Sequence, residues 1–200
     1  VGATPGMQSY YNRRAEKALS GNDVRNRFAF SSVYELPFGV GRKYLSEGLV
    51  ARAFGGWNIG AILTLQQGSP FGLTTQVNTL NAFSGGQRVN LLRDPNLPAS
   101  QRTVQRYFDT EAAIAPPQFT FGTAGRSILT GPGLANLNLS LLKNFRLAET
   151  WNLQFRLESF NAPNRANFEE PGGALGSPNF GVITSAMDAR SMQLGLRLTF

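Results

Sequence analysis

The sequence predicts an all-β fold of antiparallel, up-and-down strands, each with one apolar and one polar face. Several runs alternate strictly between apolar and polar side chains, which is the period of a β-strand, and clusters of Gly, Pro, Asn and Ser separate them. Although 42% of the 200 residues are hydrophobic, no stretch of about 18 consecutive apolar residues occurs, as a membrane-spanning helix would require. If the chain crosses a bilayer, it therefore does so with strands.

Five strands are predicted, in the order in which the alternation occurs. The first covers 27–36 and ends before Pro37, which cannot donate to a ladder. The second covers 57–66, with a short extension over 71–75 after the break at Gly68, and the third covers 136–147. The fourth and fifth cover 151–158 and 192–200. Residues 1–23 are predicted to be a loop or the end of a preceding strand.

The connections between these strands differ greatly in length. Segment 148–150 is minimal, 38–52 is intermediate, and 76–132 and 162–189 are long. Transmembrane barrels have short periplasmic turns and long extracellular loops, and every connection falls on the expected side if the C-terminus is periplasmic. We therefore interpret 24–200 as part of a transmembrane β-barrel, with 76–132 and 162–189 as extracellular loops. Long loops on a rigid scaffold carry recognition, and Phe83, Tyr107 and Phe108 are candidates for contacting a ligand there.

Composition excludes most catalytic chemistry. The chain has no Cys and no His, which removes disulfides, cysteine nucleophiles, Ser-His-Asp triads and the common zinc sites. We predict no enzyme activity and no catalytic, cofactor-binding or metal-binding residue. Glu169 and Glu170 are interpreted as a solvated loop tip. The net charge of +7 comes from dispersed Lys and Arg, so contacts to anionic lipid headgroups and solvated loops are expected, and no nucleic-acid partner.

The polar faces of the last three strands are predicted to line the lumen of the barrel. The candidates are Asn136, Asn138, Ser140, Asn152, Gln154, Arg156, Glu158 and Arg197. Their expected role is to line a water-filled face or to hold an inner domain by hydrogen bonds, with Arg156 and Glu158 pairing across strands. Lys143 falls on the apolar face, where we expect it near the inner interface, snorkelling or displaced by a bulge.

One register is predicted from the rule that directly opposed residues of an antiparallel pair face the same side. Across the turn 148–150, Leu147 should oppose Trp151, Phe145 should oppose Leu153 and Ser140 should oppose Glu158.

The last strand resembles the closing strand of bacterial outer-membrane barrels, which ends on an aromatic residue and is read by the barrel-assembly machinery. The matching residues are Gln193, Gly195, Leu198 and Phe200. The resemblance implies the outer membrane of a Gram-negative bacterium as the location, with membrane lipid and the assembly machinery as partners. Because the sequence begins without an initiator Met or a signal peptide, we expect it to be the C-terminal fragment of a longer, exported protein.

Several phrases together resemble the C-terminal barrel of TonB-dependent outer-membrane receptors, most of all the Oar-like branch common in acidobacteria. They follow the family's order: 33–39 (VYELPFG), 55–57 (GGW), 67–71 (QGSPF), 131–133 (GPG), 139–145 (LSLLKNF), 160–164 (FNAPN) and 180–184 (FGVIT). The resemblance implies a barrel of about 22 strands with a plugged lumen, of which this chain supplies about five to six, and uptake of a glycan, peptide or chelate. The plug and the TonB box belong upstream, so TonB coupling is implied by resemblance only.

Two other classes stay open on the residues alone. A passive porin or surface adhesin would share the strands and the terminal pattern but have no plug. A soluble β-sandwich binding module would pack its apolar faces against one another, and it would purify without detergent.

Overall fold

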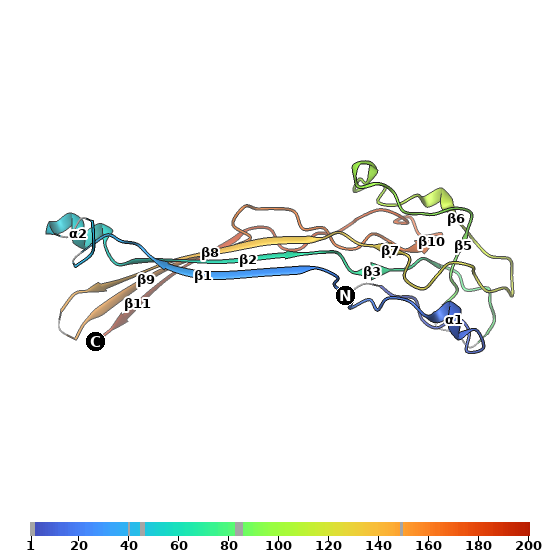
Figure 1. Ribbon diagram of the computed structural model, residues 1–200, viewed down its shortest axis with the longest axis horizontal. Coiled ribbons are helices and arrows are strands. Elements are labelled where there is room, and N and C mark those ends of the chain that lie inside the picture. The colour runs from blue at the N-terminus through green and yellow to red at the C-terminus, as the bar shows by residue number, and fades with distance from the viewer. Residues whose placement is uncertain (1–2, 40, 45–46, 83–85, 149) are drawn as a thin grey trace. The chain divides into compact units, whose positions relative to one another are not determined.

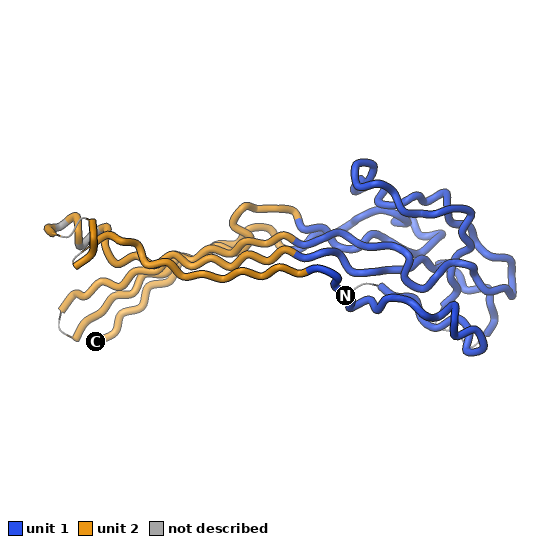
Figure 2. Tube along the Cα trace, in the orientation of Figure 1, with its two compact units in different colours: residues 1–26, 66–134, 167–187 blue, residues 27–65, 135–166, 188–200 orange. Residues whose placement is uncertain are grey.

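The computed structural model describes residues 3–39, 41–44, 47–82, 86–148 and 150–200. The chain divides into two compact units (Figure 2), each assembled from three stretches of sequence. Unit 1 comprises Val1–Asn26, Gln66–Leu134 and Asn167–Met187, and unit 2 comprises Arg27–Leu65, Ala135–Ala166 and Asp188–Phe200.

Unit 2 is built around a five-stranded sheet whose strands follow one another in chain order (Figure 1). The strands are β1 (Arg27–Glu35), β2 (Trp57–Gln66), β8 (Leu134–Arg146), β9 (Asn152–Phe160) and β11 (Ser191–Thr199). A helix, α2 (Gly48–Phe54), lies in the connection between β1 and β2. The all-β, antiparallel, up-and-down fold is thus confirmed.

The register of the central hairpin is as predicted. Phe145 pairs with Leu153 and Ser140 pairs with Glu158. Beyond the last ladder pair, the amide of Leu147 donates to the carbonyl oxygen of Trp151 at 3.0 Å. Glu149, in the predicted turn, lies outside the described residues. This register places Phe145 opposite Leu153 and Leu141 opposite Leu157 on the apolar face.

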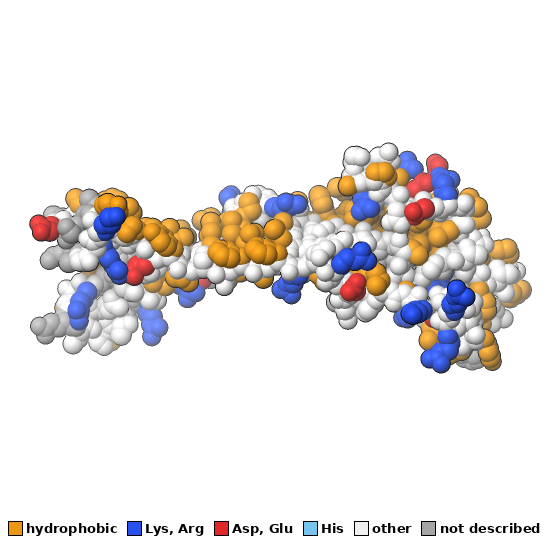
Figure 3. Space-filling model, in the orientation of Figure 1, with side chains coloured by type: hydrophobic (Ala, Val, Ile, Leu, Met, Phe, Trp, Pro, Cys, Tyr) orange, Lys and Arg blue, Asp and Glu red, His pale blue; other side chains and the backbone are white. Residues whose placement is uncertain are grey.

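On the apolar face, neighbouring strands place large side chains opposite one another. Leu141 of β8, Leu157 of β9 and Leu194 of β11 form one transverse row. Figure 3 shows hydrophobic side chains gathered over the middle of the sheet, where β1, β2 and β8 are drawn in Figure 1. β1 and β11 are the two edges of the sheet, and every residue of both strands is exposed.

Lys143 interrupts the apolar face without a bulge. The ladder from Leu139 to Arg146 is continuous, and Lys143 sits opposite Phe155. Its ammonium group lies 4.5 Å from the ring centre of Phe145 and 5.2 Å from that of Trp57, and the residue is 1% exposed. Of the alternatives expected for Lys143, displacement by a bulge is therefore wrong, because aromatic rings accommodate the cation within a regular strand.

Unit 1 contains short paired strands around a hydrophobic core. β3 (Pro70–Phe71) pairs with β7 (Leu129–Thr130), β4 (Thr74–Thr75) pairs with β10 (Ala174–Leu175), and β5 (Asn90–Leu91) pairs with β6 (Ala113–Ile114). The helical turns are α1 (Arg13–Glu16), η1 (Ala99–Gln101) and η2 (Thr110–Ala112).

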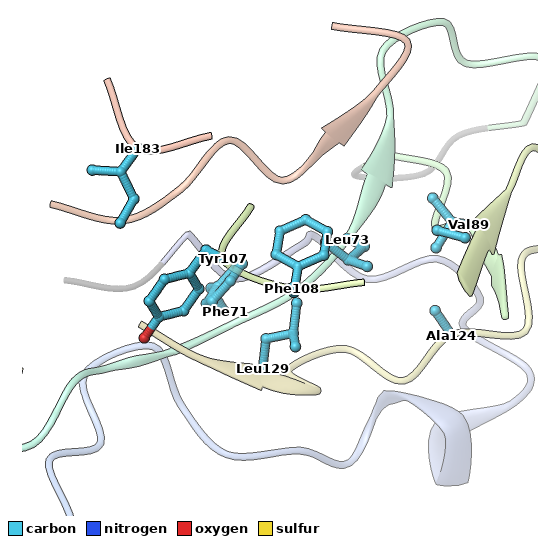
Figure 4. Close-up of a cluster of buried hydrophobic side chains, with 9 residues drawn as sticks. Phe71, Leu73, Val89, Tyr107, Phe108, Ala124, Leu129 and Ile183 are labelled. Atoms are coloured by element: carbon cyan, nitrogen blue, oxygen red, sulfur yellow. The ribbon is translucent and has the colours of Figure 1, made fainter. Parts of the chain in front are cut away.

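The core of unit 1 gathers apolar side chains from segments far apart in sequence (Figure 4). Phe108 is its centre, with its ring 6.1 Å from that of Phe71 and 5.2 Å from that of Phe180. Leu73, Val89 and Leu129 complete the packing and are buried. The long connections are therefore packed parts of one core.

A buried polar network ties residues 8–16 to the rest of unit 1. Glu16 Oε1 accepts hydrogen bonds from the amides of Gln8 and Ser9 and from Arg88 Nη2 at 2.7 Å. Gln8 Oε1 in turn accepts from the amides of Arg88 and Gly122. Arg88 is 1% exposed, so both charges of the pair have left water. Sequence reading treated residues 1–23 as a loop or strand end and did not anticipate this pair.

Among the residues that the structure describes, no helix has both the length and the apolar character needed to cross a membrane.

Candidate functional site

The polar face of the sheet brings together the side chains proposed to line a lumen. Across β8, β9 and β11, the cross-strand pairs form successive rows on this face. The rows are Ser140–Glu158–Gln193, Leu142–Arg156–Gly195, Asn144–Gln154–Arg197 and Arg146–Asn152–Thr199. Asn136 and Asn138 continue the same face toward the start of β8 by alternation. All eight candidates therefore share one face.

Hydrogen bonds link several of these side chains. Arg156 donates to Glu158 Oε1, and Gln193 donates to Glu158 Oε2 from the neighbouring strand. Gln154 Nε2 donates to Asn144 Oδ1 at 3.1 Å. Arg156 and Glu158 both belong to β9, so the expected pairing across strands is wrong. The ion pair runs along one strand, because residues two apart share a face.

Asn138 is committed to holding the end of β9. Its Oδ1 atom accepts from the amide of Asn161 at 3.0 Å and from Asn136 Nδ2 at 3.2 Å. Asn161 is buried with a φ of 49°, and its Nδ2 donates to the carbonyl oxygens of Arg165 and Asp188. Asn161 thus connects the end of β9 to the residues before β11. Sequence reading missed this role, although Asn tolerates the left-handed conformation better than most residues.

A hollow of about 370 Å³ opens on the polar face around Gly60. A Cβ atom at Gly60 would collide with Ser140 Oγ, so the Ser140 hydroxyl occupies the space that a side chain at position 60 would fill. Val33, Ile62 and Phe160 are among the side chains that line the hollow. The alternation of 57–66 places Gly60 and Ile62 on the polar face. The sequence alone therefore indicates that an apolar residue, Ile62, lies on this face.

The terminal pattern is divided between the two faces of β11. Gln193 and Gly195 lie in the polar rows, opposite Glu158 and Arg156. Leu198 faces the apolar side opposite Leu153. The ring of Phe200 lies 5.9 Å from that of Trp151, next to the turn between β8 and β9.

Two of the aromatic residues proposed to contact a ligand are instead buried in unit 1. Phe108 is fully buried in its core, and Tyr107 donates from its hydroxyl to the carbonyl oxygen of Thr130 at 3.1 Å. Burial raises the pKa of Tyr107, although nearby Arg102 opposes this shift. Phe83, the third candidate, lies outside the described residues. Tyr107 and Phe108 therefore stabilise the unit and do not present a binding surface.

Asp109 is the charged anchor beside this core. Arg93 Nε donates to its Oδ2 at 2.7 Å, and Arg106 Nη2 donates to its Oδ1 at 2.9 Å. Burial on its own would raise the pKa of Asp109, but the hydrogen bonds from Arg106 and Arg93 outweigh it and hold the pKa below its ordinary value. The carboxylate therefore stays ionised and fully engaged by two guanidinium groups.

No group of three or more acidic, His or Cys side chains that could hold a metal ion occurs in the described part of the chain.

Residues 1–193 match the model of the outer membrane beta barrel domain. No curated protein and no solved structure matches the chain. The match covers nearly the whole sequence and agrees with an antiparallel sheet that has one apolar and one polar face. The chain therefore belongs to the outer membrane beta barrel domain family, and its location is the outer membrane.

Proposed function

We propose that this chain forms part of the wall of a plugged, TonB-dependent barrel that imports a glycan, peptide or chelate across the outer membrane. The support for the TonB-dependent class is the ordered resemblance of its phrases, from 33–39 to 180–184, to that family. In this proposal the apolar face of the sheet contacts lipid and the polar face lines the lumen. The long connections, which form unit 1 with residues 1–26, are extracellular.

The observation that supports a plugged barrel is the hollow around Gly60. Val33, Ile62 and Phe160 line it and are 80%, 53% and 42% exposed. In an open, water-filled lumen these apolar side chains would stay in water. Covering one such side chain fully is worth about 1.5–3 kcal/mol, so a plug seated against the hollow gains free energy that an open pore does not.

The two edges of the sheet support a larger barrel. The outer backbone groups of β1 and β11 have no partner strand in this sheet. In lipid each unsatisfied backbone group costs several kcal/mol, so further strands pair with both edges in the membrane. The assembly machinery is the proposed reader of β11, through Gln193, Gly195, Leu198 and Phe200.

Cysteine labelling tests the plug directly, because this chain has no native Cys. The test variant is Ile62→Cys, and the control is Leu92→Cys, an exposed position in unit 1. In the full-length protein in outer-membrane preparations, a hydrophilic maleimide should label Ile62→Cys much more slowly than Leu92→Cys. Removing the region upstream of the barrel should make the two rates similar.

Equal labelling of both positions in the intact protein would favour the porin or adhesin alternative. Conductance gives an independent answer. The full-length protein in a planar bilayer should show no steady channel current, whereas a passive porin would conduct continuously.

A further inference from the structure

Unit 1 contains a second hollow, of about 340 Å³, among residues 66–69, 131–134, 167–170 and Met187. Its wall is formed by backbones in close contact. A Cβ atom at Gly68 would collide with the carbonyl oxygen of Gly131, and the amide of Gly131 donates to the carbonyl oxygen of Ser69 at 2.9 Å. Such backbone packing leaves little room for adjustment, so the hollow is preformed.

Two carboxylates, Glu169 and Glu170, belong to its lining, and no Lys or Arg does. Ser185 Oγ donates to Glu169 Oε2 at 2.7 Å, and the amide of Ala3 donates to both oxygens of Glu170 at 2.9 and 3.0 Å. These donors are neutral. The two glutamates are therefore a local negative site in a chain of net charge +7, and more than the solvated loop tip that the sequence indicated.

The other carboxylates that are buried in unit 1 are neutralised by arginine. Glu16 is paired with Arg88, and Asp109 is paired with Arg93 and Arg106. Glu170 forms no such ion pair with any described residue. Burial raises the pKa of its carboxyl group, although the hydrogen bond from Ala3 and the positive charge of the N-terminus oppose the shift. A half-buried carboxylate that the described residues contact only through neutral donors is stabilised further when a ligand places a positive charge next to it.

The other residues that line the hollow indicate which kind of positively charged group it would bind. Phe168 and Met187 are partly exposed at the hollow, and they offer an aromatic ring and a flexible apolar side chain. An aromatic ring next to carboxylates attracts an ammonium or guanidinium group. The volume is at the lower end of the range for ligand pockets, about 300–1,000 Å³, so it suits a single side chain or a small amine.

We propose that this hollow binds the ammonium or guanidinium group of an extracellular ligand, specifically a basic side chain of a peptide. Access from outside the cell rests on the proposed extracellular position of unit 1, whereas binding itself does not require a plug or TonB.

The test is equilibrium binding of trilysine to the purified, detergent-solubilised full-length protein, in which both sides of the barrel are accessible. Triglutamate and maltotriose are the comparison probes. The variants are Glu169→Gln, Glu170→Gln and their combination, and the matched control is Glu111→Gln, a carboxylate of the same unit that is 77% exposed. Heat-modifiable migration in gels checks that every variant is folded.

Trilysine should bind saturably, and more weakly as salt is added. Each single variant should weaken binding about tenfold or more, as expected for loss of a charge-assisted hydrogen bond, and Glu111→Gln should leave binding unchanged. Failure of trilysine to bind would overturn the proposal, as would equal binding by all variants. Binding of maltotriose in its place would assign the hollow to a neutral sugar. Labelling of Ile62→Cys decides the plug separately, so the two proposals fail independently.

Discussion

Replacing Glu16 by Gln should destabilise the part of unit 1 that surrounds Arg88. The Gln side chain still accepts from the amides of Gln8 and Ser9, but the guanidinium of Arg88 loses its counter-charge while 1% exposed. Burial already lowers the pKa of Arg88, with Glu16 opposing the shift. Breaking a buried ion pair by removing one partner costs about 3–5 kcal/mol, so the local free energy of opening should fall by that amount.

Removing both charges should cost much less than removing one. In the double variant Glu16→Gln, Arg88→Met no uncompensated charge is left, and the main loss is the hydrogen bond from Arg88 Nη1 to the carbonyl oxygen of Ala15, at 3.2 Å. Such a bond contributes roughly 0.5–1.5 kcal/mol, or up to about 3 when one partner is charged. The double variant should therefore be more stable than either single variant.

Hydrogen exchange of the backbone amides of Gln8 and Ser9 in the full-length protein measures this opening. A loss of about 3–5 kcal/mol should speed exchange by roughly two to nearly four orders of magnitude in Glu16→Gln. The double variant should restore most of the protection. The reasoning would be refuted if exchange in Glu16→Gln were less than about tenfold faster than in the parent. It would also be refuted if the double variant lost as much stability as the two single variants added together.

Three further predictions concern the hollow, assembly and pH. Gly60→Ala should lower the heat stability of the assembled barrel by about 1–3 kcal/mol, because its Cβ collides with Ser140 Oγ. The control combines Gly60→Ala with Ser140→Ala, which removes Oγ, leaves Ser140 Cβ at 3.7 Å and should restore the stability. Phe200→Asp should sharply reduce heat-modifiable protein in outer-membrane fractions without reducing synthesis, whereas Phe145→Ala should be milder; equal yields of Phe200→Asp and parent would remove the assembly-signal interpretation. Because the pKa of Asp109 is lower in the folded protein than its ordinary value of 3.8, its contribution to stability is complete above about pH 4 and is lost as the pH falls through the folded pKa. Asp109→Asn should therefore be less stable at pH 7 and lose less stability between about pH 4 and pH 2, as measured by hydrogen exchange, and a parallel loss in both proteins would contradict this.

The sheet could be predicted from the sequence because its information is local. A period of two residues specifies which side chains share a face, and the turn 148–150 then sets the register, so that Phe145 opposes Leu153. Lys143 shows the limit of the same reasoning. Alternation predicts that Lys143 lies on the apolar face. The contact of its ammonium group with the rings of Trp57 and Phe145 depends on the neighbouring strand and on the rotamer of Lys143.

Unit 1 could not be predicted because its contacts join distant residues. Phe71, Phe108 and Phe180 meet in one core, and Glu16 meets Arg88 across 72 positions. None of these segments has a periodic pattern of apolar and polar side chains, because their strands and turns are too short for such a pattern to repeat. Tyr107 and Phe108 were therefore assigned to a loop surface although they belong to the interior.

The way the core of unit 1 is assembled has a consequence for the order of folding. Its three stretches, Val1–Asn26, Gln66–Leu134 and Asn167–Met187, are separated by the strands of the sheet. Closing contacts between such distant segments costs loop-closure entropy before any burial compensates for it, which makes folding slow. Ile183 and Phe180, which complete the packing around Phe108, come from the last stretch. The core therefore closes late, once the stretch Asn167–Met187 is available, and until then Phe71 and Phe108 remain exposed to aggregation.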